Sequence, residues 1–123
     1  MLFRSTLLPP DINGWPVTVA KNFGDAVAQA DVVGLLRLQH ERGTGAFVPS
    51  LGEFTGTFGL TAARARLLAP HALVMHPGPM NRGVEIDSSV ADSSLAVIER
   101  QVQNGVPVRM AVLYLTMMGQ ESE

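Results

Sequence analysis

Two short apolar runs restrict the fold of this chain more than any other feature of its sequence. They read DVVGLLRLQ, from Asp31 to Gln39, and ALVMH, from Ala72 to His76. Each has the length of a strand, and a nearly continuous apolar run is typical of a parallel strand that is covered on both faces. Helix signals stand before, between and after these runs. The chain is therefore predicted to be an α/β protein, a three-layer α/β/α, Rossmann-like domain with a mostly parallel sheet.

Capping residues place the helices of this pattern. Asn22, Ser50 and Thr61 each precede a stretch with helical periodicity, and Ser50 stands before Glu53 at the spacing of a capping box. Counted with their caps, the predicted helices span residues 22–30, 50–59 and 61–68. A further short strand is predicted at 15–20, where WPVTVA contains β-branched residues.

Residues 94–123 are predicted to form the last helices of the chain. Asn104-Gly105 is a stop signal, and Pro107 suits the first turn of a new helix, because inside a longer helix it would lose the bond to Gln103. The final segment, VPVRMAVLYLTMM, is apolar on all sides, and such a helix has to be buried. The remainder of the chain offers too little to cover it. A companion domain or an oligomer interface is therefore expected.

Composition limits the possible partners. With 123 residues, 46% of them apolar and 16% charged, the chain suits one globular domain rather than a disordered segment. A net charge of -2 without any basic stretch argues against nucleic acid and anionic membranes as partners. No apolar run reaches the ~20 residues of a membrane span. Because cysteine is also absent, we expect a cytoplasmic protein without thiolate metal sites.

The turn HPGPMNRG directly follows the second apolar run. Ligands of open α/β sheets bind at the carboxyl ends of the strands, so a binding site is expected here. Pro77 and Pro79 have no backbone N–H, which makes the turn rich in acceptors and suited to an amide or carbamoyl NH2 group rather than to a phosphate. Gly78 lets a ligand approach the backbone closely, and an X-Pro bond in this turn is a candidate for the cis form.

Arg37 is the candidate for binding a charged ligand. It ends the first apolar run, and Gln39 follows on the same side of the strand. A planar guanidinium at this place suits a carboxylate. A local salt bridge to Glu41 or Asp31 explains the same arginine equally well.

Two ionisable residues near the turn are interpreted as structural. Arg82 stands three residues before Glu85, which predicts a local ion pair. His76 ends a buried strand and is interpreted as a hydrogen-bonded core histidine rather than a base. No nucleophile and base stand at a convincing spacing, so neither a catalytic residue nor a metal site is assigned.

The longer segments around these residues have a familiar order. VMHPGPMNRGVEI, followed by VADSSLAVIERQVQNGVPVRMAVLYL, resembles the carboxyl-terminal part of aspartate carbamoyltransferases. Upstream, ADVVGLLRLQHER is similar to the aspartate-loop strand of that family, and PSLGEFTGTFGLT to the helix after it. The sister family that carbamoylates ornithine has a cysteine in its version of the HPGP turn, and this chain has none. The resemblance covers nearly the whole chain.

The resemblance implies roles for five residues. Arg37 would clamp a carboxylate of aspartate with support from Gln39, and the turn of Pro77, Gly78 and Pro79 would bind the carbamoyl group through its carbonyls. The implied reaction transfers the carbamoyl group of carbamoyl phosphate to the amine of L-aspartate, giving N-carbamoyl-L-aspartate and phosphate in pyrimidine biosynthesis. No metal or organic cofactor is implied. A complete enzyme of this family is expected to be a homotrimer.

The departures from the family concern the amino-terminal side. The Ser-Thr-Arg-Thr phosphate loop and the HxxQ motif of the carbamoyl-phosphate domain do not occur here, nor does the first strand and helix of the aspartate domain. Residues 1–123 are therefore expected to be a partial aspartate-binding domain, inactive alone, with 94–123 packing on the missing domain. The alternative is a non-catalytic interaction or regulatory subunit derived from that domain. A generic nucleotide binder is disfavoured, because no GxGxxG occurs.

Overall fold

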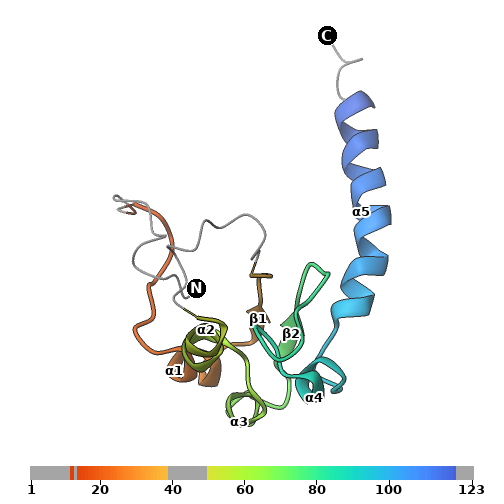
Figure 1. Ribbon diagram of the computed structural model, residues 1–123. Coiled ribbons are helices and arrows are strands. Elements are labelled where there is room, and N and C mark those ends of the chain that lie inside the picture. Colours follow the sequence, from red (N-terminus) through yellow and green to blue (C-terminus); the bar gives the residue numbers. More distant parts are fainter. Residues whose placement is uncertain (1–11, 13, 39–49, 119–123) are drawn as a thin grey trace.

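A parallel pair of strands organises the computed structural model of this chain, which describes residues 12, 14–38 and 50–118. Strand β1 (Val32–Gly34) runs beside β2 (Leu73–Met75), with Val33 opposite Val74. The pairing continues past β1, where Leu35 N donates to Met75 O at 2.9 Å. Both apolar runs therefore contain a strand and the strands are parallel, as predicted, within a mixed α/β fold (Figure 1).

A third segment extends the sheet on the far side of β2. Val74 N donates to Leu95 O at 2.8 Å, and Val97 N donates to Val74 O at 2.9 Å. Val74 and Ala96 thus form a parallel bridge, although residues 95–97 do not make a regular strand. Because the neighbours of Val74 in the chain bond toward β1, β2 lies between β1 and this segment.

The three predicted helix caps are confirmed. Asn22 Oδ1 accepts from Gly24 N at 2.7 Å, Ser50 Oγ accepts from Glu53 N at 3.0 Å, and Thr61 Oγ1 accepts from Arg64 N at 3.3 Å. The helices that they begin are α1 (Phe23–Ala28), α2 (Leu51–Phe58) and α3 (Ala62–Ala65). Gly59 ends α2 as expected, whereas α1 and α3 stop before the predicted ends. A short helix that was not predicted, α4 (Ser88–Ala91), is capped by Asp87.

One face of the sheet is buried and the other is open. The core is formed by side chains from α1, from both strands and from the segments that follow each strand: Val27, Val33, Leu35, Leu60, Leu68, Ala72, Val74, Ile86, Val90 and Ile98. On the opposite face Val32 is 51% exposed and its partner Leu73 is 41% exposed. Within the described residues, the expectation that the first run is covered on both faces is not met, because β1 is buried on the face of Val33 and exposed on the face of Val32.

The strand predicted at 15–20 is wrong. Residues 14–16 form a turn with bends and residues 17–20 are irregular. Val17 and Val19 are 42% and 37% exposed. Trp15 N donates to Ile12 O and Val17 N to Trp15 O, so these backbone donors are used locally, and Pro16 has none to offer a neighbouring strand.

The break predicted near Pro107 is also wrong. Residues Ile98–Met118 form one continuous helix, α5, with Pro107 inside it. A proline in a helix interior costs about 3 kcal/mol, but its fixed φ is already helical, so the helix can continue through it. Within α5 only Ile98 is buried, and the helix stands away from the other elements in Figure 1. Beyond Ile98, the part of the chain that the structure describes therefore leaves the apolar side chains of α5 uncovered.

Gly59 has the closest backbone neighbours of the described glycines and gives a stability prediction. A Cβ at this position would lie 2.7 Å from the carbonyl oxygens of both Thr55 and Val84. Because both atoms belong to the backbone, Gly59→Ala is expected to lower the free energy of unfolding by about 1 to 3 kcal/mol.

Gly56, in the same helix α2, is the matched control. Nothing lies within 4 Å of a Cβ at Gly56, so Gly56→Ala should raise the free energy of unfolding by about 0.5 to 1 kcal/mol through helix propensity. Urea denaturation of the full chain measures both. Equal effects of the two substitutions would contradict the close approach at Gly59.

Candidate functional site

The turn after β2 has the geometry expected of a binding turn. The peptide bond between Gly78 and Pro79 is cis, an isomer that the sequence left open, and Gly78 has a φ of 63° that side-chain-bearing residues rarely adopt. Gly78 is half-buried, while Pro77 and Pro79 are exposed. A ligand can therefore reach the backbone of the turn from solvent.

The turn offers acceptors rather than donors. Gly78 N–H is already used, since it donates to Nδ1 of His76 at 2.9 Å. Among the residues that the structure describes, none donates a hydrogen bond to the carbonyl oxygens of Pro77, Gly78 or Pro79. These carbonyls can accept N–H groups of a ligand, as an amide or carbamoyl group would provide.

His76 and Glu85 form a buried pair beneath the turn. Their side chains are 0% and 2% exposed, and His76 Nε2 lies 3.3 Å from Glu85 Oε1. The interpretation of His76 as a hydrogen-bonded core histidine is confirmed. Glu85 was not recognised as its partner, although a carboxylate between Val84 and Ile86, in an apolar run, is a signal that a buried partner exists.

Two further residues that were missed tie the turn to its surroundings. Asn81 N donates to Glu85 Oε1, and Asn81 Nδ2 donates to Leu38 O at 3.1 Å. On the other side, His76 N donates to Oε1 of Gln101, from α5, at 3.0 Å. Asparagine and glutamine have no distinctive spacing in the sequence that would have predicted these long-range contacts.

Arg37 lies on the same edge of the sheet as the turn. It follows β1 in the chain and is half-buried. It stands two residues after Leu35 and four after Val33, both buried, at the two-residue spacing of side chains that share one face of a strand. The bond from Asn81 to Leu38 brings the end of this segment to the turn, two residues beyond Pro79. Gln39, Glu41 and His40 lie outside the described residues. Asp31, which was considered as a partner of Arg37, contacts Nε2 of His71 at 2.7 Å.

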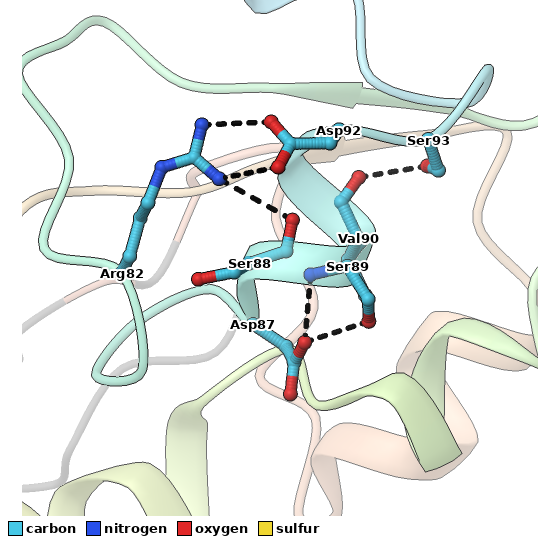
Figure 2. A network of polar contacts seen from close by, with 7 residues as sticks. All are labelled: Arg82, Asp87, Ser88, Ser89, Val90, Asp92 and Ser93. Atoms are coloured by element: carbon cyan, nitrogen blue, oxygen red, sulfur yellow. Dashed lines mark hydrogen bonds and ion pairs between the residues drawn. The ribbon is translucent and has the colours of Figure 1, made fainter.

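Arg82 pairs with Asp92 (Figure 2), whereas Glu85 pairs with His76. Its guanidinium donates two hydrogen bonds to the carboxylate, at 2.8 and 2.9 Å, and one to Ser88 O at 3.3 Å. The predicted pair with Glu85 is wrong, because that side chain is buried against His76 while Arg82 stays exposed. Arg82 thus holds the end of α4 and is interpreted as structural.

Hydrogen bonding lowers the pKa of two carboxyl groups in this surface network. The bonds from Arg82 lower the pKa of Asp92, and the bonds from Ser89 lower the pKa of Asp87. At pH values above the ordinary pKa of a carboxyl group, a lowered pKa in the folded state stabilises that state. This stabilisation is lost as the pH falls through the lowered pKa. Both groups are exposed, so the effect on stability is small.

The Arg82–Asp92 pair gives a direct titration prediction. In Arg82→Gln, the pKa of Asp92 is expected to rise toward its ordinary value, while the pKa of Asp87, held by Ser89, stays low. Carboxyl titration by NMR measures both groups in one sample. Arg100→Gln, which changes an exposed arginine on α5, is the matched control. If the pKa of Asp92 is the same in Arg82→Gln as in the wild type, the pair does not form in solution.

Two other kinds of functional feature are not found among the described residues. Over residues 12, 14–38 and 50–118, no group of three or more His, Cys, Asp or Glu side chains could hold a metal ion. Across the same part of the chain, no helix is long and apolar enough to cross a membrane.

Comparison with known proteins gives one consistent family. The family described as aspartate/ornithine carbamoyltransferase, Asp/Orn binding domain, matches residues 11–116. The aspartate carbamoyltransferase catalytic subunit of Parafrankia sp. is 53% identical over 118 residues, which are 96% of this chain and 38% of that protein. The subunit of Mycobacterium avium is 52% identical over 94% of this chain and 36% of its own length. The chain therefore spans just over a third of these curated relatives.

A solved structure agrees with the sequence relatives. Aspartate transcarbamoylase from Trypanosoma cruzi, in complex with carbamoyl phosphate and aspartate, matches with a TM-score of 0.61 and 33% identity. The match covers 74% of this chain and 28% of that one.

Proposed function

This chain belongs to the aspartate/ornithine carbamoyltransferase family, as an Asp/Orn-binding domain, and on that premise we propose that it forms the aspartate-binding part of an aspartate carbamoyltransferase. In the proposed reaction, the amine nitrogen of L-aspartate forms a bond to the carbamoyl carbon of carbamoyl phosphate. The bond from that carbon to the phosphate oxygen breaks, the amine gives up a proton, and phosphate leaves. The product is N-carbamoyl-L-aspartate, as in pyrimidine biosynthesis.

Five residues are proposed to bind the substrates. Arg37 clamps a carboxylate of aspartate through its planar guanidinium, with support from Gln39. The carbonyls of Pro77, Gly78 and Pro79 accept hydrogen bonds from the carbamoyl NH2 group.

One observation supports this assignment above the others. The acceptor-rich turn and the strand that leads to Arg37 meet at the carboxyl edge of the same parallel sheet, joined by the bond from Asn81 to Leu38. Ligands of open α/β sheets bind at this edge. The Trypanosoma cruzi relative, whose structure contains carbamoyl phosphate and aspartate, binds the same two substrates that we propose here.

The complete enzyme is proposed to be larger than this chain. The phosphate site would come from the part of its relatives that the chain does not span, because no Ser-Thr-Arg-Thr loop occurs in the sequence. We propose that residues 94–123 pack on that part. The same addition would complete the three-layer α/β/α, Rossmann-like domain, within a cytoplasmic homotrimer.

A second candidate function rests on the exposure of α5. Leu115 and Met117 are 68% and 71% exposed, so the helix could serve as a binding surface without any catalysis. In that case the chain acts as a non-catalytic interaction or regulatory subunit. The two candidates differ in whether carbamoyl transfer appears when the remaining part of the enzyme is supplied.

The test is the formation of carbamoyl-aspartate from carbamoyl phosphate and aspartate. The purified chain is assayed alone and together with a separately produced amino-terminal part of a relative, the complemented enzyme. We expect activity only in the complemented enzyme. Absence of activity from both samples, with the chain folded by circular dichroism and binding its complement, would favour the non-catalytic subunit.

A further inference from the structure

The buried pair of His76 and Glu85 has no role in the function proposed so far. Side chains that are 0% and 2% exposed cannot touch a ligand from solvent, yet they lie directly beneath the turn that is proposed to bind one. A buried ionisable pair contributes little net stability, because both groups lose their water. The pair therefore calls for an explanation other than stability.

Hydrogen bonds determine the protonation of the imidazole. Gly78 N–H donates to Nδ1 of His76, so Nδ1 is an acceptor and carries no proton. The ring proton of a neutral histidine is then on Nε2, which faces Glu85 Oε1 at 3.3 Å. The geometry falls short of a regular hydrogen bond, but the carboxylate is the group beside that proton. Glu85 thus keeps the ring in the form that holds Gly78.

The same carboxylate also holds the far end of the turn. Asn81 N donates to Glu85 Oε1, so one oxygen stands between the ring at the start of the turn and the backbone at its end. The residues between, Pro77 to Met80, are bracketed by these contacts. Losing the carboxylate would release both ends of the turn.

We propose that His76 and Glu85 are positioning residues, which orient the Pro77, Gly78 and Pro79 carbonyls without touching substrate. His76 accepts the hydrogen bond of Gly78 N–H. Glu85 favours the tautomer of His76 that can accept this bond, and it accepts the hydrogen bond of Asn81 N–H. This inference rests on the proposed function for the identity of the ligand. The arrangement of the turn itself can be tested without any ligand.

The first experiment measures amide hydrogen exchange by NMR in the full chain. Glu85→Ala removes the carboxylate, and Glu85→Gln keeps an acceptor oxygen of the same reach. We expect the Gly78 and Asn81 amides to exchange about tenfold faster or more in Glu85→Ala and to recover most of their protection in Glu85→Gln. The amide of Val74, bonded to Leu95 O, reports whether the sheet is intact. Long-range spectra of 15N-labelled histidine report the Nε2–H tautomer in the wild type.

His76→Asn separates the two contacts of the ring. An asparagine Oδ1 takes nearly the place of Nδ1, so Gly78 should stay protected while the link to Glu85 is lost. Unchanged exchange at Gly78 and Asn81 in Glu85→Ala, with Val74 protected, would overturn the inference. A proton on Nδ1 of His76 in the wild type would overturn it as well.

The second experiment uses the complemented enzyme and separates this inference from the proposed function. We expect Glu85→Ala to lower kcat/KM for carbamoyl phosphate roughly 10- to 100-fold, the cost of misplaced contacts, with KM for aspartate little changed and Glu85→Gln near the wild type. An inactive wild type would refute the proposed function and leave the exchange results to decide the positioning role. An active wild type matched by Glu85→Ala would refute the positioning role alone.

Discussion

Replacing Arg37 by alanine is expected to weaken aspartate binding by the complemented enzyme by about 2 to 5 kcal/mol, roughly 30- to 5,000-fold in affinity. This is the range for removing one partner of a buried, hydrogen-bonded charge pair. Arg37 is half-buried at the carboxyl edge of the sheet, so a carboxylate bound there would lose much of its water. Affinity is measured by calorimetry with aspartate in the presence of a non-reacting carbamoyl phosphate analogue.

Two further variants make the Arg37 result specific. Arg37→Lys keeps the charge but not the planar fork, so its affinity should fall between wild type and Arg37→Ala. Arg66→Ala removes an exposed arginine at the end of α3 and should leave aspartate affinity unchanged. An Arg37→Ala enzyme that binds aspartate as the wild type does would remove this residue from the site and favour the local salt bridge as its role.

Features that depend on a few neighbouring residues could be predicted from the sequence. The caps at Asn22, Ser50 and Thr61 were all correct, because a capping side chain bonds an amide two or three residues away. The two prolines made a cis bond in the turn a candidate for the same reason, since proline itself lowers the cost of that isomer, but which isomer is present came from the structure. The turn could therefore be identified as a candidate site from its own residues.

Features that depend on competing or distant interactions could not be predicted. At Pro107 the stop signals were real, but the φ of proline is compatible with a helix, so these local signals alone did not decide where the helix ends. At 15–20 the β-branched residues suit a strand, yet a strand exists only where another one pairs with it.

Charge pairing was the least predictable part of the site. Arg82 was assigned to Glu85 by proximity in the chain, whereas it bonds Asp92, ten residues away. Glu85 instead faces His76 in the core. Sequence spacing restricts pairs along a helix, but in the irregular segment between β2 and α4 the backbone path decides which side chains meet. The positioning role proposed here rests on such a pair.

The exposed α5 helix leads to the second large expected effect. We expect the isolated chain to be marginally stable and to self-associate, because most apolar side chains of α5 are exposed and none of the described elements covers them. Met110, Leu113 and Met117 are 65%, 55% and 71% exposed. Burying such a side chain contributes about 1.5 to 3 kcal/mol, which is enough to drive association. A monomer that unfolds cooperatively in sedimentation and thermal melts would contradict this expectation.

A paired substitution tests whether α5 is the surface responsible. Leu113→Glu with Met117→Glu places two charges on one face of the helix and should weaken self-association at least about tenfold, since two apolar contacts are lost. Gln103→Glu with Asn104→Glu adds the same charge at exposed polar positions of α5 and should have little effect. The complemented enzyme gives the decisive comparison. If the first pair also prevents complementation, α5 packs on the rest of the enzyme; if complementation persists, the helix serves only contacts between copies of this chain.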